Sequence, residues 1–585
     1  MATANHKRAL HAEEATAFSG MDGISPCGGL ANARAIKNFK LLSDGSLCRR
    51  DGFAHLRGFD APIRAVTVRH EAEGDFLLAV AGNRFYRISL ADGSGEGAAL
   101  LSTEEGEALF FTFDGVLYLS DGTEIYQYGG GLSLAPAAGY IPLYGQNWDQ
   151  ASSQRPIHEP INLLSQKIRV HYLLDEMSSM MRMDTGLDVV SVDRVFADGV
   201  EITDYTAEFS DAYQVLRFGG SVTYKREVEV CLTLERGYWH DAVLRSCTHL
   251  ARYDSFSCER LFFYGGEAGD ALFGTVPVSE EALAASQRMD EGTSGIYLPK
   301  GRQVAFGDGK AITAVCRVGD RMMICSENRS WITEQMGEIS HLAVDKLPVR
   351  SLSQTLGCRV LGGVAVLDGE IPVTLSEGGI YRWSIDPKME RECEVTRISD
   401  GIAEEIGAGF SGGARIFRPT AEDALWVCPA GDGDGRVWIY SCEKEHWVSY
   451  TGIGATHLFE TGGGVGFAEG GDLYRFENGR QTDLLPYGER EIVASFESRR
   501  MDFGDVEARK KAVRLYVEAE ADGGELTVGL YDGALLDEAS FRGDAKTRLY
   551  TARVNTPRFH RLSAVIRVKG NRPWRICGMC VHIGM

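Results

Sequence analysis

Short strand-forming runs joined by tight turns recur along this 585-residue chain, and they constrain its fold more than any other feature. Runs of four to eight apolar or alternating residues are bounded by Gly, Asp, Asn and Ser, which is the pattern of β-strands. The dipeptide Asp-Gly suits a two-residue hairpin because glycine tolerates positive φ, and it occurs fourteen times. The sequence therefore predicts an all-β fold built from hairpins.

Six of the hairpins form similar units of strand, turn and strand, often followed by an aromatic strand. They span residues 76–88, 109–128, 311–333, 364–383, 424–450 and 464–476. Repeated up-and-down units of this size are typical of β-propeller blades, which bury their faces only when several stack around an axis. The alternative is a series of unrelated β-meanders. Helical patterns are few, and we expect helices only at Glu280–Met289 and near Leu10–Ala17.

Changes in texture divide the chain into five expected parts. Between two sets of blade-like units, a stretch in which apolar and polar residues strictly alternate favours an inserted β-sandwich. Strands at about ten-residue spacing favour a second, jelly-roll-like β-sandwich at the C-terminus. A mixed stretch at 240–307 is expected to carry the chain back from the insertion to the propeller. The expected parts are an N-terminal segment (1–34), the first part of the propeller (35–146), the insertion (147–241), the second part of the propeller (242–487) and the C-terminal domain (488–585).

Composition and charge narrow the class of protein. Hydrophobic residues make up 44% and charged residues 24%, which is ordinary for globular chains and excludes a disordered or collagen-like protein. The sequence contains no apolar run of 18 residues, and its first twenty residues are polar, so we expect neither a membrane anchor nor a secretory signal. The net charge of −21 argues against nucleic acid as a tightly held ligand.

The thirteen cysteines are scattered, and we expect them to be reduced and mostly buried. Cys577 and Cys580 form a single CxxC pair. A zinc site would need a second pair or nearby histidines. We interpret these two cysteines as strand residues that face opposite sides, because positions three apart in a regular strand do so.

Motifs for catalysis or cofactor binding are missing from the sequence: it has no GxSxG, HExxH or GxxxxGK[ST] pattern. GDGK at 307–310 is expected to be a hairpin turn. GDGDG at 431–435 resembles a calcium loop, but Arg436 and Val437 stand where an EF-hand needs a ligand and a glycine, so an exposed turn is favoured. We predict no catalytic residue, no metal and no cofactor.

The segment Ala35–Phe53 reads AIKNFKLLSDGSLCRRDGF and resembles the opening motif of a group of bacteriophage tail proteins. The matching residues are Asn38, Phe39, Asp44, Gly45, Ser46, Leu47, Arg50, Gly52 and Phe53. Later segments resemble further motifs of the same proteins, in the same order. These are HEPINLLSQKIRVHY with Pro160, Asn162, Leu163 and Leu164, then the unit around GDGKAITA, then LSEGGIYRW at Leu375–Trp383, and finally SFESRRMDFGD before the last strands.

The relatives that the resemblance points to are tail-hub, nozzle and stabilisation-type virion proteins. The resemblance implies a non-enzymatic propeller that forms a ring, contacts other tail or portal and adaptor proteins, and surrounds a channel through which DNA passes. An acidic lumen would keep passing DNA from adhering, because like charges repel. The expected location is the virion, after synthesis in the cytoplasm of the bacterial host.

Two alternatives remain open at this stage. A glycan-active propeller hydrolase would need convergent carboxylates. With 82 acidic residues some carboxylate pairs occur by chance, and the sequence does not single out a catalytic pair among them. The Asp-box turns of sialidases are missing from the sequence. A carbohydrate-binding propeller scaffold would need an exposed aromatic platform. The tryptophans in the repeat units are expected to serve packing instead; these are Trp331, Trp383, Trp426, Trp438 and Trp447.

Basic residues stand in neighbouring pairs at three places in this acidic chain. We consider them candidates for contacts with an acidic assembly partner or with DNA phosphate, and the alternative is a set of solvated surface charges. The candidates are Arg49, Arg50, Arg499, Arg500, Lys510 and Lys511.

Overall fold

The computed structural model describes residues 10–21, 28–149, 152, 154–174, 178–210, 213–222, 227–255, 258–306, 309–385, 393–406, 410, 412–429, 435–462 and 464–584. Strands account for 54% and helices for 6% of the chain, which confirms the all-β class. The chain divides into two compact units. The first comprises residues 1–81, 86–96 and 358–585, and the second comprises residues 82–85 and 97–357.

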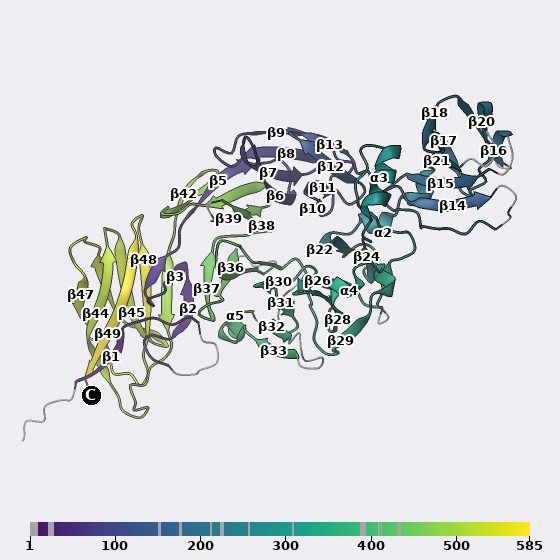
Figure 1. Cartoon of the computed structure of the whole chain (residues 1–585). Helices are drawn as coiled ribbons and strands as arrows, with labels where there is room; N and C mark the ends of the chain where they lie inside the picture. The colour runs from purple at the N-terminus through teal and green to yellow at the C-terminus, as the bar shows by residue number, and fades with distance from the viewer. Residues whose placement is uncertain are drawn as a thin grey trace, which may run out of the picture. The chain divides into compact units, whose positions relative to one another are not determined.

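Within the described residues, seven sheets contain four strands in simple up-and-down order (Figure 1). Five of them stand alone. They are β6–β9 (Ile63–Glu71, Gly74–Ala81, Arg84–Ser89, Gly95–Ala98), β10–β13 (Leu109–Phe113, Val116–Ser120, Ile125–Gly130, Ser133–Pro136), β22–β25 (His249–Asp254, Glu259–Tyr264, Ala271–Gly274, Val304–Ala305), β26–β29 (Ile312–Val318, Arg321–Ser326, Ser330–Thr333, Val349–Ser353) and β30–β33 (Val364–Leu367, Ile371–Ser376, Gly379–Ile385, Cys393–Arg397).

The other two blade-like sheets are parts of larger sheets. One consists of β34–β37 (Arg415–Phe417, Ala424–Cys428, Arg436–Ser441, His446–Thr451). The last consists of β38–β40 (His457–Thr461, Gly464–Glu469, Asp472–Phe476) and takes its fourth strand, β5 (Phe53–Gly58), from the N-terminal part of the chain. The architecture is thus propeller-like at the level of its repeating sheets.

Tight Asp-Gly turns connect several of these strands as predicted. Asp114 and Gly115 have φ values of 48° and 72°, and Asp368 and Gly369 have 50° and 74°. Two successive positive φ angles define the type I′ turn, whose twist matches that of the flanking strands. The burial of Trp383, Trp426, Trp438 and Trp447 confirms their expected packing role.

The stretch at 240–307 holds a blade-like sheet, β22–β25, that the repeat pattern did not reveal. Its last strand has two residues and is separated from β24 by helix α3 (Glu280–Met289), so the unit lacks a regular spacing. The helix itself is confirmed at its predicted bounds. Ser279 caps it by accepting a hydrogen bond from the Ala282 amide, and acidic residues occupy the first turn, where the helix dipole favours them.

The expected helix near Leu10–Ala17 is wrong, because this segment forms strand β1 (Leu10–Ala15). It pairs antiparallel with the last strand, β49 (Trp574–Gly584), from Leu10 opposite Gly584 to Ala15 opposite Met579. The remaining helical segments described are short. They are α1 (Arg236–Trp239), α2 (Ala242–Arg245), α4 (Met336–Ile339), α5 (Ala403–Ile406), η1 (Val344–Lys346) and η2 (Asp400–Ile402).

Two sheets in the second unit interrupt the series of blade-like sheets. They share a hydrophobic core that includes Tyr172, Val195, Leu216 and Leu232. One sheet has the order β14-β15-β21-β17-β18 (Leu143–Asp149, Lys167–Leu173, Glu227–Leu234, Val189–Ala197, Val200–Ile202), and the other has the order β16-β20-β19 (Ser178–Arg182, Tyr213–Val222, Tyr205–Ser210).

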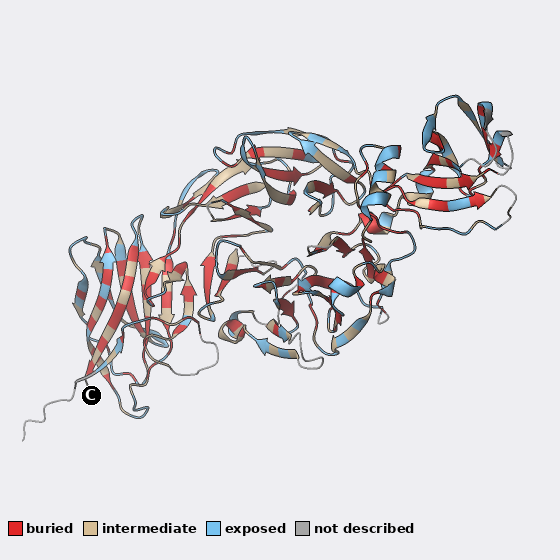
Figure 2. Ribbon diagram, viewed as in Figure 1, coloured by how far each residue is buried: buried red, intermediate tan, exposed pale blue. Residues whose placement is uncertain are grey.

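The C-terminal strands build two further sheets in the first unit, and N-terminal strands complete both. β43, β48, β45 and β46 (Ala494–Ser498, Ser563–Lys569, Glu525–Asp532, Ala534–Arg542) continue the sheet of β34–β37 through β2 (Ala33–Lys37). β44, β47 and β49 (Lys511–Ala521, Leu549–Arg553, Trp574–Gly584) are joined by β1 and by β3–β4 (Phe39–Leu41, Leu47–Arg49). Buried and exposed residues alternate along these strands (Figure 2), as expected for sheets with one face in a core.

A hairpin, β41–β42 (Thr482–Leu485, Gly488–Glu491), follows the seventh blade-like sheet and touches β5 through a parallel bridge between Leu484 and Ala54. In the part of the chain that the structure describes, no helix is both long and apolar enough to cross a membrane.

Candidate functional site: a closure junction and a basic pocket

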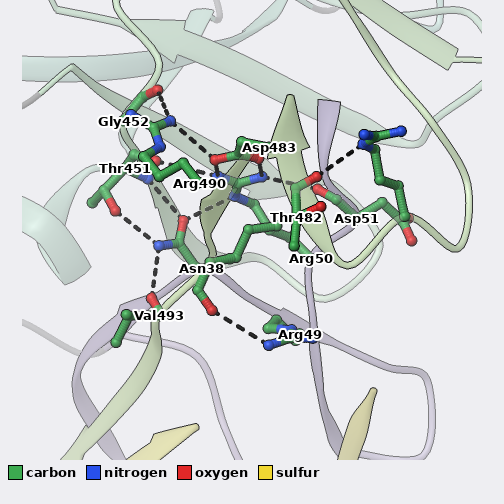
Figure 3. Close-up of polar contacts among 12 residues, drawn as sticks. Asn38, Arg49, Arg50, Asp51, Thr451, Gly452, Thr482, Asp483, Arg490 and Val493 are labelled. Atoms are coloured by element: carbon green, nitrogen blue, oxygen red, sulfur yellow. Dashed lines mark hydrogen bonds and ion pairs between the residues drawn. The ribbon is translucent and has the colours of Figure 1, made fainter. Parts of the chain in front are cut away.

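Four of the six candidate basic residues lie in two regions of the first unit, and the first region is built by the segment Ala35–Phe53. We call it the closure junction and define it as Asn38, Arg49, Arg50, Thr451, Asp483 and Arg490. It joins the N-terminal segment to strand β37 and to the hairpin β41–β42 (Figure 3), and through Arg49 to the loop between β48 and β49.

Asn38 turns the chain between β2 and β3 with φ of 57°, a left-handed conformation that asparagine tolerates better than most residues. Its side-chain nitrogen donates to the Thr451 hydroxyl at 2.8 Å and to the Val493 carbonyl at 2.9 Å. Its side-chain oxygen accepts from the Thr451 amide at 2.9 Å. One buried amide therefore joins the N-terminal segment to two segments that lie 413 and 455 residues further along the chain.

Arg50 forms the central ion pair of the junction. Its two terminal nitrogens donate to the two carboxylate oxygens of Asp483 at 2.8 Å and 2.9 Å, and its Nε donates to Asn38 Oδ1 at 2.9 Å. The side chains of Arg50 and Asp483 are only 1% and 2% exposed. A buried, two-point pair of this kind holds its geometry firmly, and removing one partner leaves an uncompensated charge in the interior.

Further groups surround this pair. Arg490 donates to the same Asp483 carboxylate at 3.0 Å, so the carboxylate lies between two guanidinium groups. The Arg50 guanidinium also lies over the rings of Phe53, Tyr450 and Phe476, at 5.6 to 5.9 Å from their centres. Cation–π attraction therefore adds to the ion pair in a site shielded from water.

Arg49 points toward the C-terminal sheets. Its Nη2 donates to Gln481 Oε1 at 2.7 Å and to the Arg572 carbonyl at 2.8 Å, and its Nη1 donates to the Gly570 carbonyl. The residue is 2% exposed, and burial lowers the pKa of its guanidinium. Two neighbouring arginines thus tie the N-terminal segment to different parts of the first unit.

The remaining residues of the segment serve the same junction. Phe39, Leu47 and Phe53 are buried. A Cβ on Gly52 would lie 2.0 Å from the Thr482 carbonyl oxygen, so only glycine fits beside β41. Asp44 accepts hydrogen bonds from the Ser46 hydroxyl and amide at 2.6 and 2.9 Å, and these bonds lower the pKa of the Asp44 carboxyl to about 2.

Arg499 and Arg500 belong to the second region, a cavity of about 700 Å³ that we call the basic pocket. Strands β2, β43, β45 and β48 form one wall, and the segment η2–α5 contributes to another. Its charged lining residues are five cations and three carboxylates: Arg34, Lys37, Arg499, Arg500, Arg567, Glu404, Glu405 and Glu497. Arg499 is buried and Arg500 is exposed.

Lys510 and Lys511 are not among the lining residues of this pocket. Lys510 is fully buried and donates from Nζ to the carbonyls of Ala508, at 3.0 Å, and Asp505. Lys511 is half-buried at the start of β44. The structure therefore gives Arg49, Arg50 and Lys510 acceptors in their own chain, and the expected contact of the six residues with another molecule stays a prediction.

Several residues of these regions were not singled out from the sequence. Asp483, Arg490 and Lys37 had no local pattern that marks them, and the buried partner of Asp483, Arg50, comes from a distant segment. For Asp483, the one available hint is an acidic residue inside an otherwise apolar run, TDLL, which is unusual for a buried strand.

Cys577 and Cys580 are strand residues of β49, but the expectation that they face opposite sides is wrong. The register between β44 and β49 shifts between Glu518 and Ala519, which inserts one extra residue at Cys577. Such a bulge returns both cysteines to one face, where both are half-buried and line the same shallow groove. Both thiols are free, and burial raises their pKa values.

Among the residues that the structure describes, no group of three or more His, Cys, Asp or Glu side chains is arranged to hold a metal ion. The GDGDG segment lies largely outside the described residues, as residues 431–434 are not among them, and so do residues 307–308 of GDGK.

Comparisons with known proteins place this chain in no family. No family model matches it, and neither does any curated protein. Among solved structures it is similar to the extracellular domain of the one component system BT4673 from B. thetaiotaomicron, with 9% identity and a TM-score of 0.36 over 93% of this chain. This chain spans 62% of that domain.

Two further solved structures cover 74% of this chain each. The WD40 domain of Neurospora crassa Pan2 has 7% identity, a TM-score of 0.32 and 96% of its own length covered. BBS1N in complex with ARL6DN has 9% identity, a TM-score of 0.25 and 98% covered. All three TM-scores are too low for the similarity to indicate a shared function.

Proposed function

We propose that this chain is a non-enzymatic structural protein of a phage or prophage virion, part of the tail hub, nozzle or head–tail connection through which DNA passes. In this proposal the blade-like sheets form one β-propeller that carries an inserted β-sandwich and a C-terminal, jelly-roll-like β-sandwich. Several copies assemble into a ring with other tail or portal and adaptor proteins.

The observation that carries the proposal is the ordered series of phage-like motifs, above all the segment Ala35–Phe53. Its residues in this chain have structural tasks: Asn38 and Arg50 hold the closure junction, and Gly52 permits the close approach of β41. A motif whose residues pack in the core and join distant segments of the chain fits a protein with a structural role.

Sheets that contain strands from both the N-terminal and the C-terminal parts of the chain support the same role. β5 from the N-terminal part completes the seventh blade-like sheet, and β1 to β4 complete the C-terminal sheets. An open sheet edge is a template for unwanted pairing with other chains. The N-terminal strands cover such edges, which matters in a protein that assembles with other copies. The net charge of −21 also suits a wall past which DNA moves, because like charges repel.

Deletion of the gene from the phage or prophage tests the proposal. We expect particles with defective tails and a large loss of infectious titre, both restored by a plasmid copy of the gene. Normal tails and an unchanged titre would contradict the proposal, and the purified protein would then be assayed for glycan hydrolysis and on a glycan array.

A further inference from the structure

We propose that the basic pocket binds a carboxylate-rich peptide segment of a neighbouring protein in the particle. The inference deepens the proposed structural role and rests on it only for the source of the peptide. The pocket itself, its charges and its acceptance of such a peptide are properties of the isolated chain.

The charge of the pocket is opposite to that of the chain. Five cations and three carboxylates line it, in a protein whose net charge is −21. Two of the carboxylates are already neutralised: Glu497 pairs with Arg34 at 3.1 Å, and Glu405 pairs with Arg436, which does not line the pocket. The excess of positive charge is therefore local and available to an incoming anion.

Three of the cations carry that excess. Within the described part of the chain, Lys37, Arg500 and Arg567 form no ion pair with a carboxylate. The Arg567 guanidinium donates to the Tyr531 hydroxyl at 3.5 Å, which leaves the tyrosine proton free to donate to a ligand. The pocket thus offers donors of both the charged and the neutral kind.

Strand register places two of these cations in a fixed row. Lys37 of β2 lies opposite Ser495 of β43, and Ser495 lies opposite Arg567 of β48. Residues paired in this way share one face of the sheet, and adjacent strands are about 4.8 Å apart. Lys37 and Arg567 therefore flank the Ser495 hydroxyl with roughly 10 Å between their backbones, on strands that hold their side chains more rigidly than a loop would.

Size and charge pattern favour a peptide over nucleic acid. A volume of about 700 Å³ falls in the usual range of ligand sites, about 300–1,000 Å³, and accommodates a short segment. Glu404, Glu405 and Glu497 stand among the basic residues, so the positive charge of the lining is discontinuous and suits separate carboxylates better than a continuous phosphate backbone. A peptide can space its carboxylates to meet the guanidinium groups, which bind carboxylates through two parallel hydrogen bonds.

The test is a titration of the full chain with a fluorescein-labelled hexaglutamate peptide at low salt, followed by anisotropy. We expect saturable binding at one peptide per chain that weakens as salt rises, and no binding of hexaglutamine. The variant R500E/R567E is expected to weaken binding at least tenfold, and R500K/R567K, which keeps the charge but loses the two-point hydrogen bonds, to weaken it less.

A matched control makes the test specific. R548E/R553E changes the charge by the same amount at two exposed residues outside the pocket and is expected to leave the affinity unchanged. The proposal would be overturned by an equal loss of affinity in both charge-reversal variants or by the lack of saturable hexaglutamate binding. Tighter binding of a seven-nucleotide oligothymidylate would also overturn it. The thermal unfolding profile of each variant checks that its fold is intact. None of these results depends on whether the chain is found in particles, so the inference and the proposed function fail independently.

Discussion

The closure junction and the basic pocket each contain two arginines that are neighbours in the sequence, but only in the pocket is one of the two, Arg500, exposed. In the junction, Arg49 and Arg50 are buried, and carboxylate, amide and carbonyl acceptors of their own chain surround them. In the pocket, Arg500 is exposed and forms no ion pair among the described residues. The difference teaches that the position of an acceptor, and not the presence of a basic pair, decides whether an arginine stabilises the fold or can bind a partner.

The strongest way to break this comparison is to remove the carboxylate of the junction. Asp483→Ala leaves Arg50 without its buried partner, and we expect the free energy of unfolding of the first unit to fall by about 3–5 kcal/mol. Urea unfolding followed by tryptophan fluorescence measures the loss. Asp483→Asn keeps the shape of the side chain without its charge, and we expect its free energy of unfolding to lie between those of Asp483→Ala and the wild type.

Asp472→Ala is the matched control for this prediction. Asp472 also lies in the first unit and pairs with His55 at 2.9 Å, but its side chain is 36% exposed. We expect a loss below about 1 kcal/mol, because exposed ion pairs contribute little. Equal losses at Asp483 and Asp472 would mean that burial does not distinguish the junction.

A second test concerns the close approach of the backbone at Gly52. A Cβ there would meet the Thr482 carbonyl oxygen at 2.0 Å, so Gly52→Ala is expected to cost about 1–3 kcal/mol of stability through the forced shift of β41. Gly412→Ala, where a Cβ meets nothing within 4 Å, is the control and is expected to be nearly neutral. The same unfolding measurement compares the two.

The pH dependence of stability sharpens the account of the motif turn at Asp44. The hydrogen bonds from Ser46 hold the pKa of Asp44 at about 2, below its ordinary value of 3.8. The folded chain therefore binds fewer protons at this group than the unfolded chain between these two values. The stabilisation is present above about pH 4 and is lost as the pH falls toward 2.

Asp44→Asn removes this contribution. Thermal unfolding of the wild type and the variant between pH 2 and 6 should converge at the acidic end and separate above pH 4. Parallel profiles over the whole range would show that Asp44 does not contribute in this way.

The smallest expected effect on stability belongs to the pocket. Arg500→Ala removes an exposed charge without an ion-pair partner in the described chain, so we expect the free energy of unfolding to change by no more than about 0.5 kcal/mol. Set beside Asp483→Ala, this variant measures the contrast between the two regions directly. A loss comparable to that of Asp483→Ala would make Arg500 a structural residue and remove it from the pocket's binding groups.

Local chemistry made much of the fold predictable. The Asp-Gly turns at Asp114 and Asp368 impose their own backbone geometry, and strand alternation is visible over a few residues. The helix Glu280–Met289 carries its cap and its acidic first turn in the sequence. These features need no knowledge of distant segments.

Features that depend on distant pairing were missed. Leu10–Ala15 is a strand because β49 offers it an edge, and Cys577 shares a face with Cys580 because a bulge shifts the register. At the site, the six basic candidates were visible in the sequence, but the separation of Arg49 and Arg50, in a buried junction, from Arg499 and Arg500, at an open pocket, was not. That separation depends on Asp483, whose partner Arg50 is 433 residues away.

The copy number of this chain in purified particles tests the proposed structural role most directly. Phage particles would be induced from the bacterium that carries the gene, purified on a density gradient and measured by quantitative peptide mass spectrometry against the portal protein. The account predicts that the chain co-purifies with the particles in a fixed ratio, comparable to that of the portal. Particles that lack the chain, with the protein remaining in the cytoplasmic fraction, would contradict it.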